Sequence, residues 1–402
     1  MKRLCITLCL ILLVSMLAAC SESVGNRNRG DVQPGNNIPH NTADNPSGTS
    51  DTSHNTGDTP HGITTPDENG SLMERLKMDL GNNIIVDATV RTPNVMNFSV
   101  RQVVPHTFDV AIAREFLLGE NFWVDDSMPT VDGVTFHTNG THNFMHDVGG
   151  LRESISLFPV SCENPVSTLV ITEPTENDLD FMSRDEAVQI VLDLLQNIGI
   201  TALPTSILSL DYETIRTAVA FTNQMFGTKL PHYTSFSESY IIEFAQVLNG
   251  VSVYSGQYGI ELRAGTEMTP GIAGSRPWIS AVVTEAGIVN LSVGSIFNLV
   301  STEPQVTELI SLELAIETGR QSLADIINVE TLVINDIELA YVILPKSLQE
   351  LDSFEAWPTW VFRTAQEVAF PGGRGGQDII HIQERAVFVC AINGIILRDR
   401  FR

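Results

Sequence analysis

The stretch SRDEAVQIVLDLLQNIG, residues 183–199, decides the fold class, because it encodes one clear amphipathic helix that strands follow. Ser183 and Glu186 form the pattern of a capping box in its first turn, and Gly199 is typical of a residue that ends a helix. The apolar residues recur at helical spacing, which places them on one face. They are Ala187, Ile190, Val191, Leu194, Leu195 and Ile198.

The residues after this helix have the pattern of strands. Apolar and β-branched runs predict strands at 206–218, 240–248, 251–254, 279–283 and 288–293. Asn249-Gly250 joins two of these runs and is a strong signal for a two-residue hairpin turn, because both residues adopt positive φ readily. The segment 176–300 is therefore predicted to be an α+β module.

The same order of helix, long strand and antiparallel hairpin recurs near the C-terminus. The sequence predicts a helix from Ser311, strands at 332–344 and 357–364, and a hairpin at 385–398. This repetition predicts a duplicated module, 176–300 and 301–402, in which each helix packs on a curled antiparallel sheet. The fold class expected for the whole body is α+β.

The preceding segment, 71–175, is predicted to form a small α+β N-terminal subdomain. We expect helices at 71–81 and 107–118 and strands at 83–92 and 99–104. A capping-box pattern at Ser71 supports the first helix. Phe108, Ile112 and Phe116 are expected to form the buried stripe of the second.

The first residues have the pattern of an export signal. Residues 1–19 begin with Lys2-Arg3, continue as an apolar run and end in Leu-Ala-Ala before Cys20. This ending resembles a bacterial lipobox, which implies cleavage before Cys20 and a lipid on its sulfur, or otherwise an ordinary signal peptide. We therefore expect a lipoprotein on the extracytoplasmic face of the cell membrane. Residues 20–70, which are poor in large apolar side chains, are expected to be a disordered tether.

The charge of the chain bears on its partners. The 402 residues include 48 Asp and Glu but only 23 Lys and Arg, for a formal net charge of −25. Nucleic-acid binding requires a basic surface, so no nucleic-acid partner is expected. The membrane surface is also anionic, so attachment is expected to depend on the lipid and not on charge.

Two cysteines remain after signal removal and lipidation. Cys162 and Cys390 could form a disulfide in an exported protein. Cys390 lies in an apolar run that predicts a buried strand, so a small buried hydrophobic side chain is the alternative, and a reactive thiol is a third.

The sequence offers few candidates for chemistry. His137, His142 and His146 could supply a zinc site, but neighbouring Asn-Gly and Gly-Gly pairs predict a loop with solvated histidines. The acidic pairs Asp125-Asp126 and Asp178/Asp180 are not distinctive in so acidic a chain. No catalytic residue and no cofactor are predicted.

Trp357 and Trp360 flank Pro358 in a predicted strand. A proline near the start of a strand suggests an edge strand, where the aromatic side chains could meet a partner. Packing in the core is the other interpretation of the two rings.

The C-terminal segment resembles a known group of proteins. The helix start at 311–315, the strand at 335–341, the strand at 358–362 and the hairpin at 391–396 resemble the C-terminal unit of the YycH/YycI regulatory proteins and PepSY-like modules. The chain as a whole resembles a group of uncharacterised Gram-positive lipoproteins, with Ile85-Val86-Asp87-Ala88 as its N-terminal strand. YycH and YycI modulate a sensor kinase by contact, so the resemblance implies a regulatory role without catalysis.

These observations favour a non-enzymatic binding or regulatory lipoprotein of the cell envelope, with another envelope protein as its partner. The alternative is an envelope hydrolase or metal-dependent enzyme that uses His137, His142 and His146. A solute-binding lipoprotein would fit the anchor but is disfavoured by the antiparallel hairpins.

Overall fold

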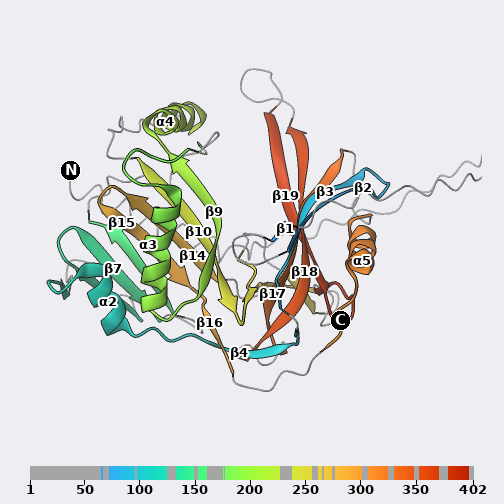
Figure 1. The fold of residues 1–402 in the computed structure, drawn as a ribbon, viewed down its shortest axis with the longest axis horizontal. Coiled ribbons are helices and arrows are strands. Elements are labelled where there is room, and N and C mark those ends of the chain that lie inside the picture. The colour runs from blue at the N-terminus through green and yellow to red at the C-terminus, as the bar shows by residue number, and fades with distance from the viewer. Residues whose placement is uncertain are drawn as a thin grey trace, which may run out of the picture. The chain divides into compact units, whose positions relative to one another are not determined.

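In the computed structural model, strands dominate a mixed structure that has two large open sheets (Figure 1). All described elements belong to one compact unit, Gly62–Arg402. The described residues are 65–66, 72–95, 97–124, 133–148, 153–160, 175, 177–226, 238–255, 261–264, 267–273, 277–300, 307–324, 330–347, 353–370 and 379–397. The α+β class is thereby confirmed. The predicted signal peptide and Cys20 lie outside the described residues.

Eight of the described strands form the first sheet, in the order β1-β2-β3-β17-β18-β4-β16, with β19 also paired to β18. All its pairs are antiparallel except β3 with β17. The strands are β1 (Thr65–Pro66), β2 (Leu72–Asp79), β3 (Ile84–Thr92), β4 (Arg101–Pro105), β16 (Phe297–Leu299), β17 (Leu332–Pro345), β18 (Phe354–Phe370) and β19 (Ile379–Cys390). Residues 65–66 fall within the predicted tether, so the folded body begins earlier than expected.

Nine of the described strands form the second sheet, in the order β11-β10-β14-β15-β8-β7-β6-β5, with β9 also paired to β10. They are β5 (Trp123–Val124), β6 (Val134–Thr138), β7 (His142–Asp147), β8 (Ser154–Pro159), β9 (Ala202–Leu210), β10 (Ser239–Leu248), β11 (Val251–Ser252), β14 (Trp278–Thr284) and β15 (Gly287–Gly294). A separate two-stranded sheet pairs β12 (Glu261–Ala264) with β13 (Glu267–Ala273).

Four helices are described: α2 (Val110–Leu118), α3 (Arg184–Asn197), α4 (Tyr212–Phe226) and α5 (Leu312–Ala324). No helix in the described part of the chain is both long and apolar enough to cross a bilayer. The α3 prediction is confirmed in detail, because Ser183 and Glu186 make the capping box and Gly199 follows with a φ of 81°. Its buried residues join the core of the nine-stranded sheet, although Ile190 is exposed.

The core of the eight-stranded sheet depends on a β-bulge in β17. Ile334 pairs with Thr364 of β18, and Asp336 pairs with the next residue, Arg363, so Asn335 is an extra residue. Before the bulge, Leu332 and Ile334 face the core; beyond it, the odd-numbered residues Ile337, Leu339, Tyr341 and Ile343 face the same core. A bulge shifts the alternation of side chains by one residue, which keeps both halves of β17 on one apolar face.

The predicted strands at 83–92 and 332–344 are confirmed as β3 and β17. The two hairpins predicted in 240–254 and 279–293 are also confirmed, and Asn249 and Gly250 both have positive φ as their turn requires. The predicted last hairpin is shorter than expected in the described part of the chain, which ends at residue 397, because its second strand is represented there by an isolated bridge, Val389 with Ile396.

The helix predicted at 71–81 is wrong, because this segment forms β2. Its side chains alternate between partly buried Leu76, Met78 and Leu80 and exposed Arg75 and Lys77. The two-residue alternation of apolar side chains therefore indicates the secondary structure correctly here, and the capping-box pattern at Ser71 does not. The strand predicted at 206–218 is also partly wrong, since β9 ends at Leu210 and α4 begins at Tyr212.

The helix predicted at 107–118 is shorter, and its buried stripe is wrong. Asp109 caps α2, whose buried residues are Ala113 and Leu118. Ile112 and Phe116 are both half exposed, while Phe108 is buried before the helix begins. Apolar residues occur on more than one face of this helix, so the pattern alone does not show which face is buried. The helix packs on β7, and the face that carries Ala113 and Leu118 is the buried one.

The suggestion that Pro358 marks an edge strand is wrong, because β18 lies between β17 and the strands β4 and β19. Residues Phe354 to Ala356 pair with β4, and the pairing with β19 begins at Thr359. The carbonyl of Pro358 accepts from the N–H of Ala391, just beyond β19, and the carbonyl of Ala391 accepts from the N–H of Ile310, so the missing N–H of proline leaves this acceptor satisfied. Trp360 is buried in the core, in agreement with the alternative interpretation.

The predicted segment boundaries do not coincide with the two large sheets. The segment 71–175 contributes β2, β3 and β4 to the eight-stranded sheet, and it contributes β5 to β8 to the nine-stranded sheet. The chain passes from one sheet to the other through α2, between β4 and β5, and again through only two residues, Ser295 and Ile296, between β15 and β16. Buried Gln246 of β10 joins the two sheets, since its side-chain amide exchanges two hydrogen bonds with the backbone of Phe297 in β16.

The bulge makes a direct prediction about stability. Ile337→Ala should lower the free energy of unfolding by about 2–5 kcal/mol, because the bulge turns this side chain into the core. Asn335→Ala, at the exposed extra residue, should change it by less than about 0.5 kcal/mol. Urea denaturation followed by circular dichroism measures both, and equal losses would contradict the assignment of the bulge.

Candidate functional site

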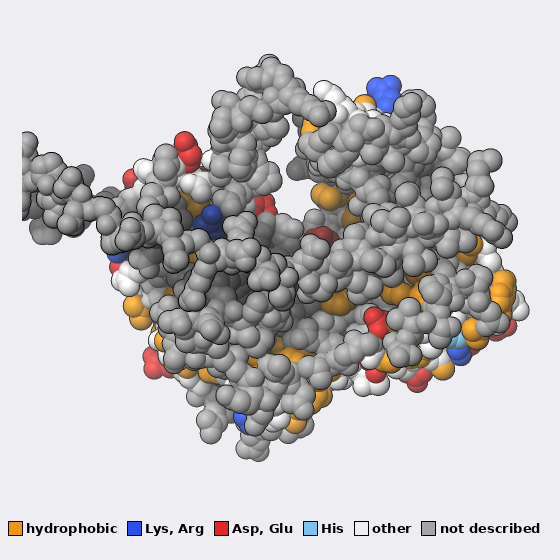
Figure 2. Space-filling model, turned by 180° about the vertical axis from the view of Figure 1, so that it is seen from behind, with side chains coloured by type: hydrophobic (Ala, Val, Ile, Leu, Met, Phe, Trp, Pro, Cys, Tyr) orange, Lys and Arg blue, Asp and Glu red, His pale blue; other side chains and the backbone are white. Residues whose placement is uncertain are grey.

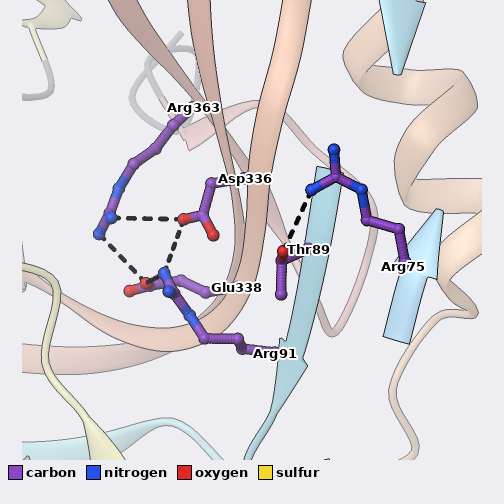
Figure 3. A network of polar contacts seen from close by, with 6 residues as sticks. All are labelled: Arg75, Thr89, Arg91, Asp336, Glu338 and Arg363. Atoms are coloured by element: carbon purple, nitrogen blue, oxygen red, sulfur yellow. Dashed lines mark hydrogen bonds and ion pairs between the residues drawn. The ribbon is translucent and has the colours of Figure 1, made fainter. Parts of the chain in front are cut away.

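Four charged side chains meet on the eight-stranded sheet (Figure 3). Arg91 of β3 contacts Asp336 at 2.7 Å and Glu338 at 2.9 Å, and both carboxylates belong to β17. Arg363 of β18 approaches the same two carboxylates, at 3.3 Å and 3.1 Å. Each carboxylate is thus shared by two guanidinium groups from the two neighbouring strands.

The strand register explains this arrangement. Glu338 is the partner of Arg91 across the parallel pair, and Asp336 is the partner of Arg363 across the antiparallel pair. Asp336 and Glu338 are two residues apart, so they share one face of β17. Because the bulge at Asn335 turns Ile337 toward the core, both carboxylates point to the opposite face.

Partial burial makes these charges interdependent. The carboxylate side chains of Asp336 and Glu338 are only 16% and 11% exposed, and the two arginines are about one-third exposed. Burial raises the pKa of Asp336, an effect that the nearby charges of Arg91 and Arg363 oppose. Burial would lower the pKa of Arg363, but Glu338 and Asp336 outweigh it and the pKa is raised.

Other contacts of polar side chains lie on both sides of this network. Toward one edge of the sheet, Asp87 of β3 forms ion pairs with Arg75 and Lys77 of β2, and these contacts hold its pKa below the ordinary value. On the other side, the guanidinium of Arg363 lies 5.6 Å from the centre of the Tyr254 ring. The carboxylates of Asp336 and Glu338 are therefore more buried than that of Asp87, which is 33% exposed.

The chemistry of this network favours a structural role. Two guanidinium groups and two carboxylates cancel in charge. Oδ2 of Asp336 and Oε2 of Glu338 already accept hydrogen bonds from arginine. An anionic ligand would have to displace a carboxylate from its arginines. Removal of one partner from a partly buried ion pair is costly, because the remaining charges lose their compensation.

Glu338→Ala should therefore lower the free energy of unfolding by about 1–3 kcal/mol. The matched control is Glu317→Ala on α5, which removes an exposed pair with Arg320 and should cost clearly less, because solvent screens exposed ion pairs. Both losses are measured by urea denaturation. A loss for Glu338→Ala no larger than for the control would show that the network contributes nothing beyond surface pairing.

The three candidate histidines lie on a β-hairpin, so the loop prediction is wrong. His137 belongs to β6, and His142 and His146 belong to β7. His137 is the cross-strand partner of Phe144, and residues 142, 144 and 146 alternate along β7, so all three imidazoles share one face. His137 and His146 are buried there, where Phe144 and residues of α2 form part of the core.

Two of these histidines are engaged with charged side chains. Nε2 of His137 lies 3.0 Å from Arg114, whose guanidinium also covers the ring of Phe122. Nε2 of His146 lies 3.3 Å from Glu153, which also accepts from the Phe108 N–H. Burial, and secondly the charge of Arg114, lowers the pKa of His137; burial also lowers that of His142.

The structure does not bring the three histidines together as metal ligands. Among the residues that the structure describes, no group of three His, Cys, Asp or Glu side chains is arranged to hold a metal ion. Asp178 instead accepts from the backbone N–H of Arg184. Cys390 is buried in β19, while Cys162, Asp125 and Asp126 lie outside the described residues.

The lowered pKa values predict a pH dependence. The unfolded chain binds protons at these histidines near pH 6.5, whereas the folded protein resists protonation, so stability should fall as the pH drops below about 6.5. His137→Gln/His142→Gln removes both titrating groups. Urea midpoints at pH 8, 6.5 and 5.5 should fall less for this variant than for the wild-type protein. Identical pH dependence in the two proteins would contradict the assignment.

Sequence reasoning missed the charged network. Asp336 and Glu338 stand at alternate positions of a mainly apolar strand, which is a signal that one face carries polar side chains. Arg91 is 245 residues from Asp336 in the sequence, so no local pattern identifies it as the partner.

Comparisons with known proteins establish the fold alone. No protein-family model matches the sequence, and no curated protein matches it. The structure is similar to the 1.45 Å crystal structure of an uncharacterized protein from Eubacterium rectale ATCC 33656, with a TM-score of 0.58 and 12% sequence identity. The similarity covers 80% of this chain and 92% of that chain. At this identity the comparison shows a shared architecture and does not assign an activity to this chain.

Proposed function

We propose that this protein is a membrane-anchored extracytoplasmic lipoprotein that acts by binding another envelope component, without catalysis. The Leu-Ala-Ala-Cys pattern that ends at Cys20 supports the anchor. The polar composition of the segment before the folded body supports a tether between the two.

The observation that carries the binding role is a group of exposed apolar side chains between residues 110 and 124. Ile112 and Phe116 are each 50% exposed, one helical turn apart on α2. Trp123 and Val124 of β5, at the end of the nine-stranded sheet, are 55% and 59% exposed. Described hydrophobic side chains that reach the surface are visible in Figure 2. Ile112 and Phe116 lie on one side of α2, and large apolar side chains exposed side by side are typical of an interaction surface.

We further propose that the fold contains a duplicated module of the kind found in YycH/YycI and PepSY-like proteins. The order of α3, β9 and the β14–β15 hairpin supports this, because α5, β17 and the β18–β19 pair follow in a similar order. A shared module of this type would be consistent with regulation by contact.

The anchor is tested with Cys20→Ala in the native membrane. The variant should appear in the medium or remain unprocessed, because the lipid that retains the protein cannot be attached. Fractionation and immunoblotting measure the distribution. Membrane retention equal to that of the wild-type protein, with normal processing, would contradict the lipoprotein assignment.

The binding role is tested by crosslinking the tagged full-length protein in native membranes and identifying captured proteins by mass spectrometry. Ile112→Asp/Phe116→Asp should lose a partner that the wild-type protein captures. Leu314→Asp is the control, since Leu314 is 52% exposed on α5, away from this segment. Capture of the same proteins by all three would contradict the assignment of the surface.

A further inference from the structure

The indole ring of Trp278 lies flat on the nine-stranded sheet, over Gly294 of the neighbouring strand. The two residues are direct cross-strand partners in β14 and β15. A Cβ atom at Gly294 would lie 2.1 Å from Cζ2 of the indole and 2.5 and 2.6 Å from the two adjacent ring atoms. If this Cβ atom met the indole edge-on at Cζ2, the two adjacent ring atoms would lie about 3 Å from it. The shorter distances show that the flat face of the ring covers the glycine.

The orientation of this ring is fixed by one hydrogen bond and by its contact with Gly294. Its Nε1–H donates to the hydroxyl of Ser292 at 3.1 Å. Gly294 is buried beneath the ring, yet Trp278 remains 45% exposed. One face of the indole is therefore against the sheet, and the exposed area belongs to the opposite face and rim. A large apolar surface is held in a single orientation before any ligand arrives.

Hydroxyl groups extend from the ring across the same face of the sheet. Ser280 pairs with Ser292, and Ser292 pairs with Ser156, so three serines form a row over β14, β15 and β8. All three serines are partly exposed, and the residues on either side of each serine in its strand are buried. Neighbouring strands lie about 4.8 Å apart, so the hydroxyls recur at roughly the width of one sugar ring. Glu243 of β10 extends the row as the partner of Ser280.

We propose that this face binds a carbohydrate chain, with Trp278 as the stacking platform and the serine row as its hydrogen-bonding track. The C–H groups of a pyranose face are weakly positive and match the negative face of an aromatic ring. The hydroxyl groups of the sugar match serine hydroxyls, which both donate and accept. The carboxylate of Glu243 can accept from a sugar hydroxyl, but it disfavours polyanionic chains, so the ligand is an uncharged glycan.

A ring that only shields a glycine in a sheet is the competing explanation. The two explanations differ in what the serine row does. A shielding role needs the hydroxyl of Ser292 at most, whereas a glycan track also needs Ser156 and Ser280. The proposal rests on the proposed extracytoplasmic location only for its choice of probes, because an envelope protein meets wall glycans.

Isothermal titration calorimetry with the full-length protein tests the site, with hexamers of β-1,4-linked N-acetylglucosamine and of β-1,4-linked glucose as probes. The wild-type protein should bind at least one hexamer, and the comparison shows whether the acetamido group is recognised. Trp278→Ala should weaken binding by about tenfold or more. Ser156→Ala/Ser280→Ala should weaken binding without a change in melting temperature. Tyr212→Ala, which removes another exposed aromatic ring, on α4, should bind as the wild-type protein does.

Binding of neither hexamer by the wild-type protein would overturn the proposal. So would unchanged affinity in Trp278→Ala, or in the serine variant. If Trp278→Ala should unfold, Trp278→Phe keeps a smaller ring over Gly294 and should give intermediate affinity. Partner capture and membrane attachment are measured separately, so loss of glycan binding alone would leave the proposed function standing.

Discussion

The bulge at Asn335 is the constraint on which the eight-stranded sheet depends. Without it, the alternation that begins at Leu332 would turn Asp336 and Glu338 toward the core and Ile337 away from it. With the bulge, one face of β17 is apolar along its length, and the other face carries two carboxylates. Those carboxylates require compensation on both sides, which Arg91 and Arg363 supply. The hydrophobic core and the charged network therefore have one common cause.

Much of the fold follows from local pattern. The helix at 183–199 and the strand at 83–92 have a period that only one structure satisfies, and the structure confirms them. The strand at 332–344 is also confirmed, although its alternation is interrupted at Asn335. The predictions failed where the same residues fit both the pattern of a helix and the two-residue alternation of a strand. In residues 71–81 the capping-box pattern competes with alternation, and pairing with β3 resolves the competition in favour of a strand. The local sequence does not show which other strand is available for pairing.

The sites were less predictable than the fold, because their residues come from distant parts of the chain. The three histidines were recognisable by type, but their role depends on α2, which turns Arg114 toward His137. The charged network joins residues 91, 336, 338 and 363, and only the sheet order places them together. Trp278 and Gly294 are 16 positions apart, and their contact follows from the register of one hairpin. Register is a property of paired strands and not of either strand alone.

The two sheets use their outward side chains in different ways. On the eight-stranded sheet, charges of opposite sign satisfy one another, and a ligand could enter only by breaking ion pairs that are partly buried. On the nine-stranded sheet, Trp278 has one face against Gly294 and nearly half of its surface exposed. A ligand there would displace water from an apolar ring and would not break an ion pair of the network. Recognition therefore costs less free energy at Trp278 than at the charged network, and the network is better suited to hold strands in register.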